Sequence, residues 1–137
     1  MAAADAPLTG VELLLDWIAA LRQGDIDRIA DLLDPEVAWY GVAPDLVCVG
    51  REAVLEVLSE QIPMPLEAEA IEFVSAPPRF VMGTRSRHLP DPPDVRLAGQ
   101  VYNVFEHRDR RFVSIRDFAR RDDALRCAGA DAAAEWR

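Results

Sequence analysis

The chain has 137 residues, of which 50% are hydrophobic and 28% are charged, as in ordinary water-soluble globular domains. Its formal net charge of -9 argues against nucleic acid and membranes as partners, because both bind basic surfaces. No apolar run approaches the roughly 18 residues that span a bilayer, and the N-terminal segment lacks the features of a secretory signal. We therefore expect one cytoplasmic domain over residues 1–137, with loose tails at 1–8 and 130–137.

Helical periodicity opens the chain. Thr9 and Glu12 form a capping box, and the apolar stripe that follows predicts a helix that stops at Gly24. Asp25 is expected to cap a second helix, which ends before Pro35 because the residue before a proline avoids the helical region. The link between the two helices is very short, so we expect a packed helical hairpin.

A short aromatic and β-branched run at 36–42 predicts the first strand, and the loop that follows contains Pro44. A third helix is expected after Arg51, where apolar residues again recur at helical spacing. Pro63 and Pro65 close it. The first half of the chain therefore reads as two helices, a strand and a helix.

The second half has a period of about 2, which predicts strands. Their ranges are 66–74, with a bulge near Ile71, then 79–87, 97–107 and 111–120. The turn between the last two strands is Arg108-Asp109-Arg110, and a short helix capped by Asp122 or Asp123 is expected to end near Gly129.

The predicted order α-α-β-α-β-β-β-β indicates an α+β fold with a short C-terminal helix. We expect a cone-shaped, curved antiparallel (mixed) β-sheet packed against three helices. A sheet curved against such a layer leaves a cavity, which is a common place for a small ligand. Cys48 and Cys127 have no companion Cys or His at metal-ligand spacing, so we expect no metal site and two reduced thiols; the sequence leaves a disulfide between them open.

Three strings carry a resemblance to a known superfamily. They are LLLDWIAALRQGDIDRIADLLDPEVAWYG, GREAVLEVL and VFEHRDRRFVSIRDFA. Together they resemble the NTF2-like superfamily, which contains SnoaL-like, ketosteroid-isomerase-like and limonene-epoxide-hydrolase-like proteins. The resemblance covers nearly the whole chain and implies an NTF2-like fold with a small-molecule pocket. It also implies a homodimer whose sheets pack face to face.

The resemblance transfers only part of the known catalytic patterns. Ketosteroid isomerases place a carboxylate base just after the first strand, where this chain has Tyr40-Gly41-Val42 and no acid. Limonene-epoxide hydrolases use an acid–arginine–acid relay, and Asp117 in the string 115–118 matches one acid. Tyr40 matches the tyrosine that positions water, but Val42 replaces the family's asparagine. Arg87 stands where the second acid is expected.

The predicted site lies on the last two strands. Alternation places Val113, Ile115 and Asp117 on one face, and the resemblance turns Val101, Asn103 and Phe105 inward on the preceding strand. We predict three catalytic residues: Asp117, Asn103 and Tyr40. The predicted ligand-binding residues are Trp17, Trp39, Phe80, Met82, Arg85, Val101, Phe105 and Ile115.

Each catalytic assignment has a structural alternative. Asp117 in an apolar cavity would have a raised pKa and act as a general acid or base, or it would pair with an arginine or accept backbone N–H bonds. Asn103 would orient a water or a carbonyl, or form a core amide. Tyr40 would donate to an oxyanion, or be a core aromatic residue. Only one of Arg85 and Arg87 can face the cavity, and we expect both histidines, His88 and His107, at the surface.

Two functions follow from this site. The first is a cofactor-free enzyme that hydrolyses, isomerises or cyclises a small apolar molecule by acid–base chemistry. The second is a non-catalytic ligand-binding module or dimeric scaffold. The sequence leaves open whether the protein is an enzyme, and it names no substrate.

Overall fold

The computed structural model describes residues 9–42, 47–61, 70–76, 78–86 and 99–129. The elements in chain order are α1 (Thr9–Gln23), α2 (Ile26–Leu32), β1 (Leu33–Tyr40), β2 (Val47–Val49), α3 (Arg51–Gln61), β3 (Ala70–Ala76), β4 (Arg79–Arg85), β5 (Gln100–Arg108), β6 (Arg111–Phe118) and α4 (Arg121–Ala128).

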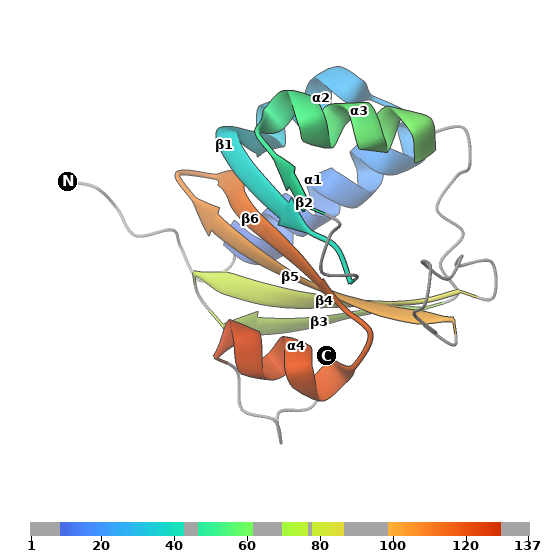
Figure 1. Cartoon of the computed structure of the whole chain (residues 1–137), viewed down its shortest axis with the longest axis vertical. Helices are drawn as coiled ribbons and strands as arrows, with labels where there is room; N and C mark the ends of the chain where they lie inside the picture. Colours follow the sequence, from blue (N-terminus) through green and yellow to red (C-terminus); the bar gives the residue numbers. More distant parts are fainter. Residues whose placement is uncertain (1–8, 43–46, 62–69, 77, 87–98, 130–137) are drawn as a thin grey trace.

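The strands form one mixed sheet in the order β2-β1-β6-β5-β4-β3. Strands β3 to β6 form an antiparallel meander, and β1 joins it by pairing in parallel with β6. Helices α1, α2 and α3 cover one face of the sheet, here called the inner face, and α4 lies against the other, the outer face (Figure 1). The α+β prediction is confirmed.

The helical hairpin forms as predicted. Gly24 ends α1 with a positive φ of 66°, a conformation that glycine adopts without strain. The side chain of Asp25 then accepts a hydrogen bond from the backbone N–H of Arg28 at 3.1 Å, which caps α2. The backbone N–H of Asp25 also donates to the carbonyl of Ala20 at 2.9 Å, so the link is tight.

The region around β1 differs from the prediction. Strand β1 begins at Leu33, directly after α2. Strand β2 was not predicted, because its three residues are too few to show a period. After β2, the backbone N–H of Gly50 donates to the carbonyl of Val37 at 2.7 Å. The guanidinium of Arg51, the first residue of α3, donates twice to the carbonyl of Leu33, at 3.1 and 2.8 Å. These bonds tie α3 to the start of β1.

The meander corrects one further prediction. The register of β3 with β4 runs without interruption from Ala70 to Ala76, so the bulge expected near Ile71 is wrong. The irregularity in this part of the sheet lies instead between Glu106 and His107, where β5 pairs with β6. The predicted strand residues 66–69 and 87 lie outside the described residues.

The turn before β6 and the end of the helix that follows it both contain residues with positive φ. Asp109 and Arg110 both have positive φ, 54° and 62°, as a two-residue type I′ hairpin turn requires. Helix α4 ends at Gly129 with φ of 76°, as expected. The capping prediction for Asp122 or Asp123 is wrong, because both lie inside the first turn. There their negative charges interact favourably with the positive end of the helix dipole.

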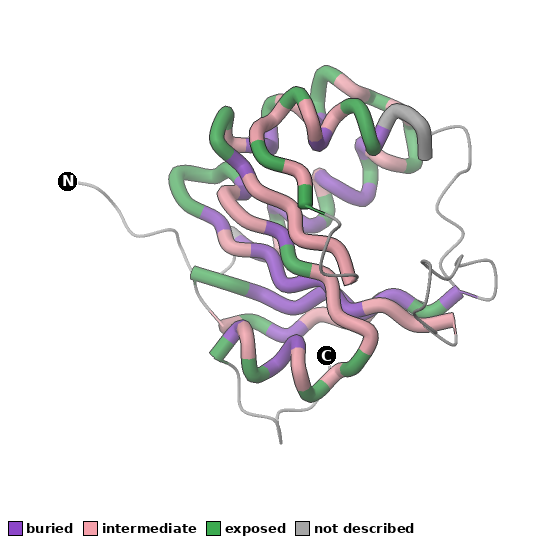
Figure 2. Tube along the Cα trace, viewed as in Figure 1, coloured by how far each residue is buried: buried purple, intermediate pink, exposed green. Residues whose placement is uncertain are grey.

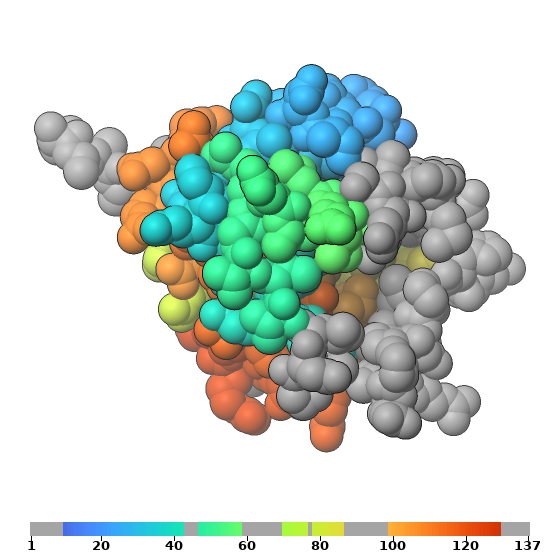
Figure 3. Space-filling view, turned by 45° about the horizontal axis from the view of Figure 1, so that its top comes forward, coloured from blue at the N-terminus to red at the C-terminus, as the bar shows by residue number. Residues whose placement is uncertain are grey.

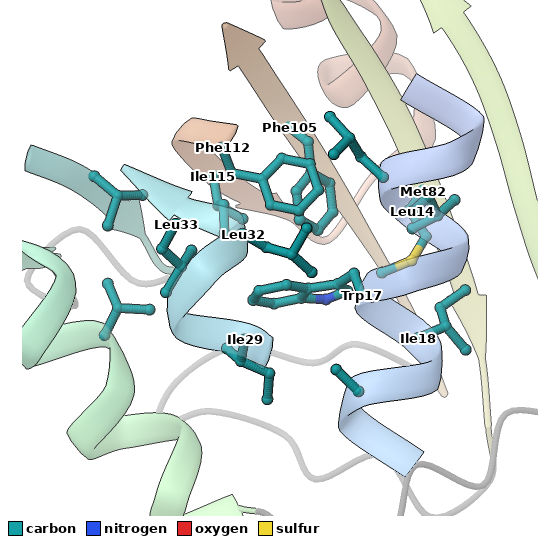
Figure 4. Close-up of a cluster of buried hydrophobic side chains, with 14 of the residues drawn as sticks. Leu14, Trp17, Ile18, Ile29, Leu32, Leu33, Met82, Phe105, Phe112 and Ile115 are labelled. Atoms are coloured by element: carbon teal, nitrogen blue, oxygen red, sulfur yellow. The ribbon is translucent and has the colours of Figure 1, made fainter. Parts of the chain in front are cut away.

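The inner face carries the larger core. Trp17 projects from α1 between α2 and the sheet and is surrounded by aliphatic and aromatic side chains (Figure 4). Its ring centroid lies 5.8 Å from that of Phe105 and 5.5 Å from that of Phe112, in both cases edge to face. Burial is continuous along the middle of β4 and β5 (Figure 2).

A smaller core lies on the outer face, where Leu125 and Ala128 of α4 pack against Val81 and Val104. From the side of the inner-face helices, α2 and α3 form a continuous cover, and the tip of the β5–β6 hairpin emerges at one edge (Figure 3). The sheet therefore has helices on both faces: three cover the inner face, as predicted, and α4 covers part of the outer face.

Candidate functional site

The candidate site is a cross-strand row on the inner face. The register places Asp117 of β6 opposite Asn103 of β5, and Asn103 opposite Met82 of β4. The next row contains Ile115, Phe105 and Phe80, with Trp39 of β1 beside Ile115. Alternation along each strand therefore turns these side chains toward α1, α2 and α3.

The carboxylate of Asp117 is held by two donors from two different strands. The indole Nε1 of Trp39 donates to Oδ2 at 2.9 Å. The amide Nδ2 of Asn103 donates to Oδ1 at 2.5 Å. Both donors are neutral, and in the described part of the chain no ion pair involves Asp117. The alternative in which Asp117 pairs with an arginine is therefore not seen among the described residues.

Burial raises the pKa of Asp117 from 3.8 to about 6, because an apolar environment disfavours the ionised form. The hydrogen bonds from Trp39 and Asn103 act in the opposite direction and lower this pKa, since both favour the carboxylate. The residue as a whole is partly buried. The site thus holds an acid that changes protonation close to neutral pH.

The predicted ligand-binding residues on the inner face fall into two groups. Trp17, Phe80, Phe105 and Ile115 are 0–2% exposed and pack on one another, so they form the floor of the site. Trp39 and Val101 are only partly buried, and Met82 is 5% exposed. The second group lies in the same rows as Asp117 or in the rows next to it.

Tyr40 does not lie in this site. It follows Trp39 on β1 and therefore points to the outer face, where it pairs in register with Arg116. The guanidinium of Arg116 lies 4.2 Å from the centre of the Tyr40 ring. Both residues line an open depression of about 340 Å³ on that face. The prediction that Tyr40 faces the cavity with Asp117 is wrong.

Arg85 also lies on the outer face. It is exposed and borders a small cleft together with Glu72, Gln100 and Tyr102. Because it points away from the inner face, the prediction that Arg85 binds a ligand in the cavity with Asp117 is wrong. Arg87 and His88 lie outside the described residues.

His107 was expected at the surface, and this is wrong. It is 4% exposed and lies on β5 near the start of α1, where a Cβ on Gly10 would come within 3.5 Å of its Nε2. Its backbone N–H donates to the carbonyl of Pro78 at 3.0 Å. His107 alternates with Asn103 and Phe105 along β5, and this turns its side chain to the inner face, where its ring centroid lies 6.1 Å from that of Phe80.

Sequence reasoning treated Trp39 only as pocket wall and missed its bond to Asp117. The signal that could have found it is the alternation of β1, which turns either Trp39 or Tyr40 inward but never both.

Within the described residues, no group of three or more His, Cys, Asp or Glu side chains is arranged to hold a metal ion. Of the described helices, none has the length and hydrophobicity needed to cross a membrane.

The family model of the SnoaL-like domain matches residues 14–115, from α1 into β6. This chain belongs to the SnoaL-like family. Asp117 lies two residues beyond the matched span, whereas Trp39 and Asn103 lie within it. No curated protein matches the chain at a significant level.

Solved structures share the fold of this SnoaL-like chain. A putative polyketide cyclase from Xanthomonas campestris pv. campestris has a TM-score of 0.63 at 15% identity, covering 89% of this chain and 98% of the other. An NTF2-like protein of unknown function from Burkholderia pseudomallei has a TM-score of 0.62 at 18% identity, with the same coverages of 89% and 98%. A ketosteroid isomerase-like protein from Catenulispora acidiphila, in complex with trimethylamine, has a TM-score of 0.54 at 16% identity, covering 90% and 97%. These likenesses confirm the predicted NTF2-like fold.

Proposed function

We propose that this SnoaL-like protein binds a small, mostly apolar molecule on its inner face and transforms it by cofactor-free acid–base catalysis, with Asp117 moving the proton. The observation that carries the proposal is the carboxylate of Asp117, held by two neutral donors on an otherwise apolar face, with a pKa of about 6. A group whose pKa lies near the working pH can both accept and release a proton during turnover.

Asn103 supports the same chemistry from the neighbouring strand. Its amide nitrogen holds Asp117, and the amide also carries an oxygen that can accept a hydrogen bond from a water or a substrate hydroxyl. At 8% exposure it is buried deeply enough for such a bond to form away from bulk water. In this proposal Asn103 orients the reacting group while Asp117 transfers the proton.

The surroundings favour an apolar substrate. Partly buried hydrophobic side chains pack against the inner core, and they include Leu21, Leu55, Ile71 and Phe73. Hydrolysis, isomerisation and cyclisation all need a proton moved on such a substrate without a metal or redox cofactor. Structural neighbours described as putative polyketide cyclases, and a neighbour that holds trimethylamine, support a small organic ligand.

The direct test compares the wild type with Asp117→Asn on a panel of small epoxides, steroid-like ketones and aromatic polyketides. We expect kcat/KM to fall about 10²- to 10⁴-fold in the variant, the usual contribution of a positioned acid or base. The wild-type pH profile should show an ionisation near pH 6 that the variant lacks. Glu52→Gln, an exposed change in α3, serves as the matched control and should leave turnover intact. Equal turnover in wild type and Asp117→Asn would remove Asp117 from the mechanism.

One observation favours the second candidate, a ligand-binding module without catalysis. Each oxygen of Asp117 already accepts a hydrogen bond from a protein donor, so the carboxylate can also serve to hold β1 and β5 beside β6. Calorimetry with the same panel distinguishes the two functions. Binding that persists in Asp117→Asn, with no conversion of the ligand by the wild type, supports the binding module.

We also propose a homodimer and a cytoplasmic location, as the sequence predicts. The outer face beside β1 supports association, because Val47 and Val49 are 46% and 72% exposed there and neighbour the depression at Tyr40. Light scattering at micromolar concentration should give twice the chain mass of 15.2 kDa, and Val49→Glu should reduce it. A monomeric wild type would contradict the dimer.

A further inference from the structure

Trp39 makes a hydrogen bond to Asp117 that is absent from the catalytic patterns implied by the resemblance. It lies on β1, 78 residues before Asp117 in the chain, and reaches it because β1 pairs in parallel with β6. Its indole Nε1 lies 2.9 Å from Oδ2 of Asp117, a good hydrogen-bond distance. The contact thus depends on the pairing of two strands from opposite ends of the chain.

We propose that Trp39 is a positioning residue for the acid–base step proposed for Asp117, its indole N–H fixing Oδ2 while Asn103 fixes Oδ1. A carboxyl group on its own turns easily about its last torsion, which has broad energy wells. Two donors on different strands, each on a different oxygen, fix that torsion. Each carboxylate oxygen has two lone pairs, so one remains on each for the reacting proton.

The donor is itself held from both faces of the sheet. On the inner face the Trp39 ring lies 6.3 Å from the buried Trp17 ring, at an interplanar angle of 53°. On the outer face the next residue along β1, Tyr40, stacks with Arg116, the residue before Asp117. The indole and the carboxylate are therefore anchored at the same point of the β1–β6 ladder, and this rigidity makes Trp39 suited to orienting a neighbour.

Few ionisable groups of the described strands share this face with Asp117. Cys48 of β2 lies opposite Trp39 in the register, and His107 lies four residues along β5 from Asn103. Arg85 and Arg116 point to the outer face. Burial raises the pKa of Asp117, and the two hydrogen bonds from Trp39 and Asn103 lower it, so loss of one donor should move the pKa upward.

The test follows the titration of Asp117 by carbon-13 NMR of its carboxyl group in the full chain, and it needs no substrate. Trp39→Phe keeps the aromatic ring and removes the N–H, so the pKa of Asp117 should rise further, by about one pKa unit. Tyr40→Leu is the matched control, because it removes the stacking on the outer face at the same register and should leave the pKa in place. No change in Trp39→Phe, or an equal change in Tyr40→Leu, would overturn the proposal.

A second measurement follows the indole N–H in the wild type, so its main result does not depend on how well a variant folds. The indole N–H resonance of Trp39 should shift with a midpoint near pH 6, that of Asp117, and this shift should vanish in Asp117→Asn. An indole resonance that does not follow the titration of Asp117 also overturns the proposal. Once a substrate is known, the ionisation in kcat/KM should move in Trp39→Phe as the NMR titration does, and a profile that stays in place contradicts positioning. The proposed function fails separately, on unchanged turnover in Asp117→Asn.

Discussion

Two neighbouring side-chain contacts join strands β1 and β6 on opposite faces of the sheet. On the inner face the indole of Trp39 donates to the carboxylate of Asp117. On the outer face the guanidinium of Arg116 lies over the ring of Tyr40. Both pairs join an aromatic residue of β1 to a charged residue of β6, so they differ mainly in their surroundings.

The surroundings decide what each pair can do. Asp117 is enclosed by apolar side chains, and this desolvation brings its pKa to about 6. Arg116 is exposed, beside an open depression, where water screens its charge. The same strand pairing therefore gives a chemically tuned acid on one face and a modest stabilising contact on the other.

The largest expected effect comes from removing the packing beneath the inner pair. Trp17→Ala deletes a 2% exposed indole that contacts Trp39, Phe105 and Phe112. The free energy of unfolding should fall by about 3 to 5 kcal/mol, the usual loss for such a cavity. Urea denaturation measures it. Leu15→Ala on the same helix is the control: Leu15 is 62% exposed, and the change should cost less than about 0.5 kcal/mol. Similar losses in both variants would mean that Trp17 is not a core residue.

The next prediction tests whether burial of Asp117 lowers the free energy of unfolding at neutral pH. Its pKa is higher in the folded chain, about 6, than the ordinary 3.8, so between these values the folded state binds the extra proton. The contribution of Asp117 to stability is therefore greatest below about pH 4 and declines as pH rises through 6. At about 1.4 kcal/mol per pKa unit, the total decline is about 3 kcal/mol.

Asp117→Asn removes this dependence, because an amide does not ionise. Compared with the wild type, the variant should gain about 2 to 3 kcal/mol in the free energy of unfolding between pH 4 and pH 8. Denaturation at several pH values measures the difference, with Leu15→Ala as a control whose difference from wild type should stay constant. A constant difference for Asp117→Asn as well would show that Asp117 is not desolvated.

The smallest effect concerns the outer pair. A double-mutant cycle with Tyr40→Leu and Arg116→Gln should give a coupling energy of about 0.5 to 1 kcal/mol, as expected for an exposed cation–π contact. Thermal denaturation of the four proteins at one pH supplies the cycle. A coupling above about 2 kcal/mol would show that the outer pair is buried in solution, for instance by association of two chains.

Much of the fold could be predicted because its signals are local. The stop of α1 at Gly24, the cap of α2 at Asp25 and the tight turn at Asp109 and Arg110 each follow from the chemistry of a few adjacent residues. Three residues were too few to reveal β2, and the α4 cap was misplaced by two or three positions because two consecutive aspartates offered the same signal.

Alternation along the last strand placed Asp117 on an apolar face, and the resemblance turned Asn103 of the preceding strand toward it. Only the tertiary structure decided which side chain of β1 joins them. A shift of one residue exchanges Trp39 for Tyr40, and the parallel pairing of β1 with β6 sets this phase across nearly eighty residues of chain. Local periodicity carries no information on such pairing, so the sequence located the acid, and the fold supplied the indole that holds it.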